Sequence, residues 1–128
     1  MTVELTMLVC AVGLWIAQLL VAVTGGMMQF PAPVLAGNRE TPCDGKGWVG
    51  RAQRAYRNMS ESLLPFAALV LVAHAAGVSN DLTVMGAKLF LYARMAYAVI
   101  YVAGIPWLRT IVWTAGFAGI LLILAQLH

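Results

Sequence analysis

Four long hydrophobic segments dominate this 128-residue chain and restrict the folds open to it. Each segment reaches or exceeds the roughly 20 residues that a helix needs to cross the hydrocarbon layer of a bilayer. Glycine and proline separate the segments, and none alternates apolar and polar residues as strands do. We therefore predict an all-α integral membrane four-helix bundle, one domain over residues 1–128, with spans at about 2–30, 47–77, 81–103 and 106–128.

The composition supports this class. Hydrophobic residues make up 62% of the chain and charged residues only 10%, whereas a soluble domain carries about a quarter charged residues. The net charge of +3 is modest. Membrane orientation explains the basic residues better than nucleic-acid binding does, so we expect a lipid bilayer as the surroundings and no nucleic-acid partner.

The basic residues also predict an orientation. They gather around the first and third loops, whereas the second loop offers only Asp81 and the ends of the chain offer Glu4 and His128. The positive-inside rule then places loops one and three in the cytoplasm and both termini outside, in a multi-pass protein of the inner (cytoplasmic) membrane. The residues that carry this prediction are Arg39, Lys46, Arg51, Arg54, Arg57 and Arg109.

A stripe of polar side chains enters the second segment. Arg51, Arg54, Asn58 and Glu61 fall within about 80° of one another on a helix, so they share one face. Each charge near the centre of a bilayer costs roughly 2.5–3.5 kcal/mol on insertion scales, and ionisable groups there usually mark a functional site. The stripe predicts a site for a polar molecule at the edge of the membrane.

The third segment carries a matching stripe. Arg94, Tyr97 and Tyr101 share a helix face, and Arg94 lies too far from either end to reach water cheaply. Glu61 is the acid at comparable depth, so we predict a contact between Arg94 and Glu61, either as a structural clamp or as part of a ligand site. Asn58 and Tyr101 lie at one depth, about 28 Å from the outer ends of their helices, and are expected to face each other.

The third loop leads into the last segment through Pro106, which suits the first position of a helix. Arg109 follows within the first turn, where its charge opposes the positive helix end unless an anion binds both. An anion site and an arginine that contacts lipid phosphates are the two interpretations. Ala115 and Gly119 are small residues four apart, as helix contacts in membranes prefer, and this spacing favours self-association. No cluster of His and Cys residues predicts a metal site.

Three motifs together resemble the MAPEG family, the membrane-associated proteins in eicosanoid and glutathione metabolism, and point to a bacterial-type member. The first is the segment VGRAQRAYRNMSESLLPF at 49–66. The others are Ala-Arg-x-x-Tyr-x-x-x-Tyr, which ends at Tyr101, and the turn Gly-Ile-Pro-x-Leu-Arg, which ends at Arg109. Gly50 and Ser62 depart from the family pattern, which often has an acid at the first position and in some members a larger polar residue at the second.

The resemblance implies a homotrimer with glutathione bound between subunits as co-substrate. It also implies a membrane-bound glutathione-dependent transferase or peroxidase that acts on a lipophilic electrophile. By the same resemblance Arg109 would stabilise the glutathione thiolate as the catalytic residue. The tripeptide would be held by Arg39, Arg51, Arg54, Asn58, Glu61, Tyr97 and Tyr101, and Arg94 is a further candidate for binding.

Two alternatives stay open. A member of this family can keep the scaffold and bind a lipid or a partner protein without catalysis. A small four-helix exporter coupled to protons would need an acid accessible to cations, and Glu61 is the candidate, although the arginines around it favour anions. The sequence identifies neither the lipophilic substrate nor the choice between transferase and peroxidase.

Overall fold

The computed structural model describes residues 1–37 and 43–127, and all the regular structure in these ranges is helical. Four of its helices are long and apolar enough to cross a membrane. The predicted all-α membrane bundle is thereby confirmed, and the predicted spans agree with the observed helices to within one turn. The fifth helix, α2, was not predicted. The helices are α1 (Val3–Gln29), α2 (Ala32–Ala36), α3 (Trp48–Ala76), α4 (Asp81–Ala103) and α5 (Pro106–Gln126).

Local signals explain where the long helices begin and end. The side chain of Asn80 accepts hydrogen bonds from the first turn of α4, and Thr83 donates and accepts in return as a capping box. Gly77 and Gly104 end α3 and α4 in the left-handed conformation, with φ of 71° and 84°. Pro106 occupies the start of α5, where its missing N–H costs no helical hydrogen bond.

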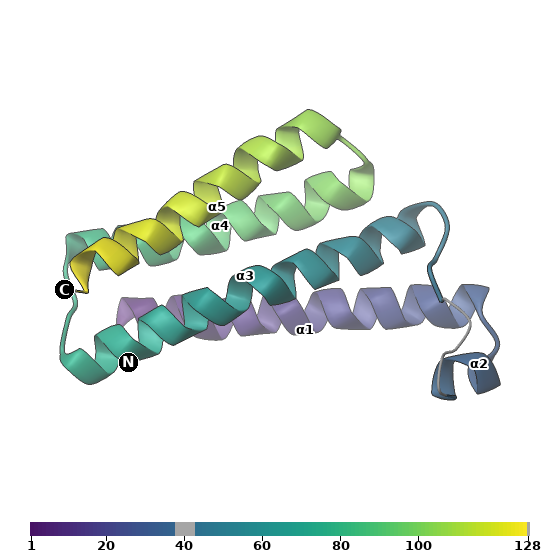
Figure 1. Ribbon diagram of the computed structural model, residues 1–128, viewed down its shortest axis with the longest axis horizontal. Helices are drawn as coiled ribbons and strands as arrows, with labels where there is room; N and C mark the ends of the chain where they lie inside the picture. The colour runs from purple at the N-terminus through teal and green to yellow at the C-terminus, as the bar shows by residue number, and fades with distance from the viewer. Residues whose placement is uncertain (38–42, 128) are drawn as a thin grey trace.

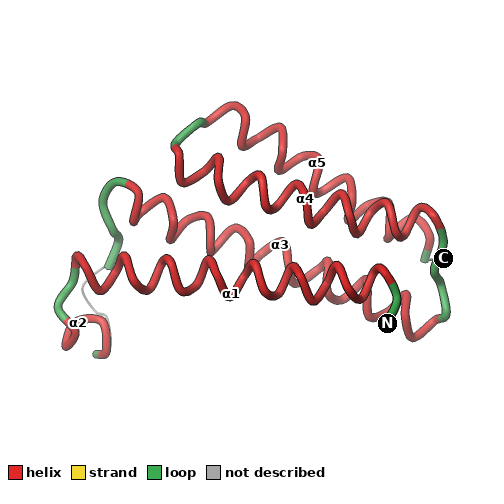
Figure 2. Tube along the Cα trace, turned by 180° about the vertical axis from the view of Figure 1, so that it is seen from behind, coloured by secondary structure: helices red, strands yellow, loops and turns green. Residues whose placement is uncertain are grey.

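The long helices form two antiparallel pairs, α1 with α3 and α4 with α5 (Figures 1 and 2). Both termini and the turn between α3 and α4 lie at one end of the bundle. The short α2 and the turn between α4 and α5 lie at the opposite end, where the two pairs diverge (Figure 1). The first and third loops are therefore on the same side of the bundle. We call this side the α2 end.

Aromatic and small residues hold the pairs together. The rings of Phe66 on α3 and Phe90 on α4 stack with centroids 4.0 Å apart, and both side chains are fully buried. Between α4 and α5 the backbones approach closely, since a Cβ built on Gly119 would lie 2.6 Å from the carbonyl oxygen of Gly86. Gly119 was expected at a helix contact, and it contacts α4 of its own chain.

Candidate functional site

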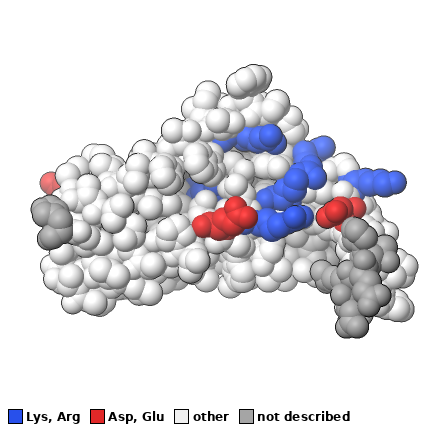
Figure 3. All heavy atoms as spheres, viewed as in Figure 1, with Lys and Arg blue, Asp and Glu red and all other residues white. Residues whose placement is uncertain are grey.

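The residues singled out in the sequence come together toward the α2 end of the bundle. They are contributed by the first half of α3, the second half of α4 and the first turn of α5. Seen in space-filling view, basic side chains gather on this part of one face, with acidic side chains beside them (Figure 3). Arg39 lies outside the described residues. The described members are Arg51, Arg54, Asn58, Glu61, Arg94, Tyr97, Tyr101 and Arg109.

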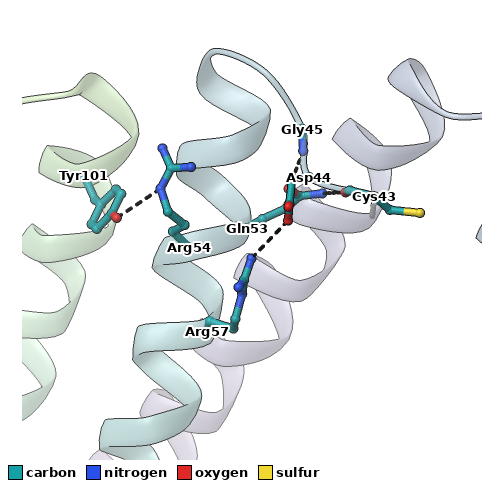
Figure 4. A network of polar contacts seen from close by, with 7 residues as sticks. All are labelled: Cys43, Asp44, Gly45, Gln53, Arg54, Arg57 and Tyr101. Atoms are coloured by element: carbon teal, nitrogen blue, oxygen red, sulfur yellow. Dashed lines mark hydrogen bonds and ion pairs between the residues drawn. The ribbon is translucent and has the colours of Figure 1, made fainter. Parts of the chain in front are cut away.

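Tyr101 joins the arginines of two other helices. Its hydroxyl accepts a hydrogen bond from Nε of Arg54 on α3, at 3.3 Å (Figure 4). The guanidinium of Arg109 on α5 lies over its ring, with Cζ 4.7 Å from the centroid. The ring of Tyr97 lies 5.4 Å away, one turn deeper along α4. Arg54 is exposed and Arg109 is half-buried, so both cations are accessible to a ligand.

Arg51 contacts the end of α4. Its Nε donates a hydrogen bond to the carbonyl oxygen of Val102, at 2.9 Å. The last carbonyl groups of a helix lack intrahelical partners, so this contact satisfies one of them. Gly104, which ends the helix with positive φ, packs beside the same side chain, since a Cβ there would lie 3.6 Å from Nε of Arg51. Arg51 therefore ties α3 to the turn that leads to Arg109.

Arg94 is almost fully buried, with 1% of its surface exposed. Its Nη1 donates a hydrogen bond to Oδ1 of Asn58 at 2.8 Å, and its Cζ lies 4.1 Å from the centre of the Tyr97 ring. The predicted contact with Glu61 is wrong. Within residues 1–37 and 43–127 the ion pair found is a different one, between Arg57 and Asp44 at 3.8 Å.

The reason lies in the rotation of α3. Glu61 follows Asn58 by three residues, which turns its side chain by about 60° around the helix axis, and it is exposed. The amide of Asn58 points toward α4 and takes the place expected for the carboxylate. The expectation that Asn58 faces Tyr101 is also corrected. Asn58 meets Arg94, which is two turns before Tyr101 on α4, and Tyr101 meets Arg54, which is one turn before Asn58 on α3. The contacts therefore pair residues one to two turns away from the expected register.

A second network, which the sequence did not suggest, fastens the loop before α3. Gln53 accepts a hydrogen bond from the backbone N–H of Gly45 at 2.7 Å and donates one to the carbonyl oxygen of Cys43 at 3.1 Å. Asp44 of the same loop pairs with Arg57 (Figure 4). The signal available in the sequence was the position of Gln53 inside the motif that resembles the family.

The departure at Gly50 has a steric cause. A Cβ at this position would collide with the carbonyl oxygen of Gly45 and would lie 3.2 Å from Nη1 of Arg54. Only glycine lets the loop approach α3 this closely. The close approach of the loop therefore explains why position 50, beside Arg54, is glycine and not an acid.

Deeper in the membrane-spanning region, Arg94 also borders a small recess between α3, α4 and α5, which has room for about one water molecule. The hydroxyl of Ser62 and several apolar side chains make up the rest of its wall. Ser62, which departs from the family pattern, therefore leaves space where a larger side chain would fill it. The other lining residues are Phe90, Trp113, Gly116, Phe117 and Ile120.

Chemically, the outer part of the site can hold an anion that also carries an amine or amides. Arg54 and Arg109 provide positive charge, Glu61 provides a carboxylate, and Tyr97 and Tyr101 provide phenols. Guanidinium groups pair with carboxylates through two parallel hydrogen bonds when geometry allows. A small, water-soluble molecule with charges of both signs fits this set of groups.

Comparison with known proteins adds one finding. The sequence model of the MAPEG family matches residues 3–127, nearly the whole chain. No curated protein matches.

Proposed function

The chain belongs to the MAPEG family, and on this premise we propose that it is a membrane-bound glutathione-dependent transferase or peroxidase that acts on a lipophilic electrophile. The observation that carries the proposal is the convergence of Arg54 and Arg109 on Tyr101 from three different helices. Such an arrangement concentrates positive charge where a soluble thiol and a membrane-dissolved substrate can meet.

The charges of glutathione suit the residues present. The tripeptide carries two carboxylates, one ammonium group and amides at neutral pH. Arg54, with Arg51 and Arg39, would hold the carboxylates, while Glu61 would pair with the ammonium group. Asn58 would hydrogen-bond to the amides of the tripeptide. Arg94 would hold Asn58 in position, because its Nη1 donates to Oδ1 of Asn58 at 2.8 Å.

Arg109 would stabilise the thiolate. A free thiol with a pKa near 8.5 is about 3% ionised at pH 7. A decrease of about 2.5 in the thiol pKa, caused by the guanidinium and the N-terminal end of α5, would raise this to about 90%. The thiolate sulfur would then form a bond to an electrophilic carbon, and the leaving group of that carbon would depart with its electron pair. With a hydroperoxide, the thiolate would attack the terminal oxygen and break the O–O bond, which gives an alcohol and a sulfenic acid; a second glutathione thiol would convert the sulfenic acid to a disulfide and water. The decrease in the thiol pKa corresponds to about 3.4 kcal/mol of differential interaction between the thiolate and the thiol.

The test is the ultraviolet absorbance of the thiolate when glutathione is added to the purified protein at neutral pH. We expect a thiolate signal in the native protein and a loss of up to about thirtyfold in thiolate fraction in Arg109→Ala, with partial recovery in Arg109→Lys. Arg57→Gln is the matched control, because Arg57 is an exposed cation whose partner is Asp44. A native protein without the signal, or an Arg109→Ala variant that keeps all of it, contradicts thiol activation.

Turnover separates catalysis from binding alone. A generic lipophilic electrophile should be conjugated by the native protein in the presence of glutathione. Glutathione binding without any turnover of electrophile or hydroperoxide would instead identify a non-catalytic binding protein on the same scaffold.

We further propose that the protein forms a homotrimer in the inner membrane, with the α2 end in the cytoplasm. Family membership supports the trimer, and the basic side chains near this end support the orientation (Figure 3). Light scattering of the detergent-solubilised protein should give three times the chain mass. An epitope tag placed before Met1 should be accessible from outside spheroplasts, whose outer membrane has been removed, and protection of that tag would refute the orientation.

A further inference from the structure

Two glutamine side chains hold the loop before α3 from opposite edges. Gln53, on α3, accepts a hydrogen bond from the backbone N–H of Gly45 at 2.7 Å and donates one to the carbonyl oxygen of Cys43 at 3.1 Å. Gln29, the last residue of α1, accepts from the backbone N–H of Lys46 at 2.8 Å and donates to its carbonyl oxygen at 3.1 Å. Each amide therefore pairs with the loop through one donor and one acceptor, as a neighbouring strand would.

These four hydrogen bonds determine where the loop lies along α3. They engage the backbone of residues 43, 45 and 46, so the loop cannot slide along the helix without breaking several of them together. The ion pair between Asp44 and Arg57 is exposed on both sides and 3.8 Å long, and such pairs contribute little. The two glutamines are therefore the main attachment of the loop.

The loop in turn lies beside Arg54. A Cβ built on Gly50 would collide with the carbonyl oxygen of Gly45 and would lie 3.2 Å from Nη1 of Arg54, so the loop backbone and the guanidinium approach the same face of Gly50. A long exposed side chain samples many rotamers unless its neighbours restrict it. With the loop in this place, the guanidinium of Arg54 is directed to α4, where Nε donates to the hydroxyl of Tyr101 (Figure 4).

We propose that Gln53 and Gln29 are positioning residues for Arg54: they hold the loop against α3, and the loop keeps the guanidinium at Tyr101, where it can pair with a carboxylate of the water-soluble substrate. That this substrate is glutathione rests on the proposed function. The two glutamines act on affinity, because a side chain ordered in advance does not have to be ordered on binding. For one long side chain this lowers the dissociation constant about threefold to tenfold.

The first measurement needs no ligand. Relaxation of the ¹⁵N-labelled arginine Nε–H groups in detergent micelles reports how rigidly each guanidinium is held. We expect Arg54 to be ordered in the native protein and clearly more mobile in Gln53→Leu, which removes both hydrogen bonds to the loop. Gln126→Leu is the matched control, because it removes a 3.1 Å hydrogen bond to Asn80 at the opposite end of the bundle and should leave Arg54 ordered.

The second measurement is the dissociation constant of glutathione, from titration calorimetry. Gln53→Leu should raise it about threefold to tenfold, and Gln29→Leu, which acts on the other edge of the loop, gives the same test if Gln53→Leu does not fold. The thiolate fraction at saturating glutathione should stay as in the native protein, since Arg109 belongs to α5 and not to the loop. Gln126→Leu should change neither quantity.

A third variant separates positioning from a general loss of structure. In a protein that carries Arg54→Gln, the glutamine substitutions should raise the dissociation constant no further, because the side chain that they position is gone. An equal increase in this background overturns the proposal. The proposal is also overturned if Arg54 stays ordered in both glutamine variants, or if neither variant changes the affinity of the native site.

The outcome for the enzyme is distinguishable from the outcome for the loop. A protein that binds no glutathione, but in which Gln53→Leu mobilises Arg54, would refute the proposed function and leave the positioning of Arg54 standing. Glutathione binding and thiolate formation that respond to neither glutamine variant would do the reverse.

Discussion

Replacement of Asn58 by alanine tests whether the buried guanidinium depends on a single amide. In the structure Oδ1 of Asn58 accepts from Nη1 of Arg94 at 2.8 Å, and the other two guanidinium nitrogens already lack partners. Asn58→Ala would leave Arg94 with only the ring of Tyr97, 4.1 Å away, as a favourable polar contact within the described chain. We expect a clear loss of stability.

The magnitude follows from known hydrogen bonds. Neutral hydrogen bonds between membrane helices contribute about 0.6 kcal/mol on average in double-mutant cycles. A charged donor roughly doubles this value, to about 1.2 kcal/mol, which is about an eightfold change in the unfolding constant. Because Arg94 is only 1% exposed, the loss of stability in Asn58→Ala can reach about 3 kcal/mol, since an unsatisfied buried charge adds its own desolvation cost.

The assay is equilibrium unfolding in mixed micelles with increasing dodecyl sulfate, followed by far-ultraviolet circular dichroism. The cycle comprises the native protein, Asn58→Ala, Arg94→Met and the double variant. We expect a coupling free energy of about 1.2 kcal/mol, because methionine removes the charge that needs the amide. Arg57→Gln, at an exposed ion pair, should change stability little. A coupling below about 0.5 kcal/mol would refute the pairing of Arg94 with Asn58.

Two further predictions concern the packing of the bundle. A Cβ in Gly119→Ala would lie 2.6 Å from the carbonyl oxygen of Gly86, so α4 and α5 must separate; we expect a loss of about 1–3 kcal/mol, seen as a lower thermal midpoint. Gly13→Ala is the control, since nothing lies within 4 Å of its added Cβ, and equal midpoints for the two variants would contradict the close approach. Trp15→Phe removes a 2.7 Å hydrogen bond from the indole to Oγ of Ser60 and should cost about 0.6 kcal/mol. If Trp15→Phe lowers the stability by the same amount in a protein that already carries Ser60→Ala, the loss does not come from this hydrogen bond.

The long helices were predictable because length and hydrophobicity alone decide whether a segment crosses a bilayer. Their ends followed from residues whose conformational needs are local, such as Gly104 and Pro106. The short helix α2 was not predictable in this way. It spans only Ala32–Ala36, too few residues for a periodic pattern, and no side chain caps its start.

The partners of the polar side chains were harder to predict than their depth. Counting residues placed Arg94 and Glu61 at one level, but contact between helices also requires the right rotation about each axis. A difference of about 60° around α3 was enough to expose Glu61 and to turn Asn58 toward Arg94. Sequence spacing gives the angle between two side chains around one helix. The packing of that helix against its neighbour decides which of the two side chains faces the neighbour.

The polar side chains of the site therefore serve two different physical purposes. Arg51 satisfies a carbonyl group at the end of α4, and Asn58 satisfies the buried Arg94, so both hold the helices together. Arg54 and Arg109 instead converge on one phenol, that of Tyr101, with no acid paired to either among the described residues. The two guanidinium groups repel each other because both contact the same tyrosine, and a bound anion reduces this repulsion. The part of the site that gains most from a bound anion is thus the one between Arg54, Tyr101 and Arg109.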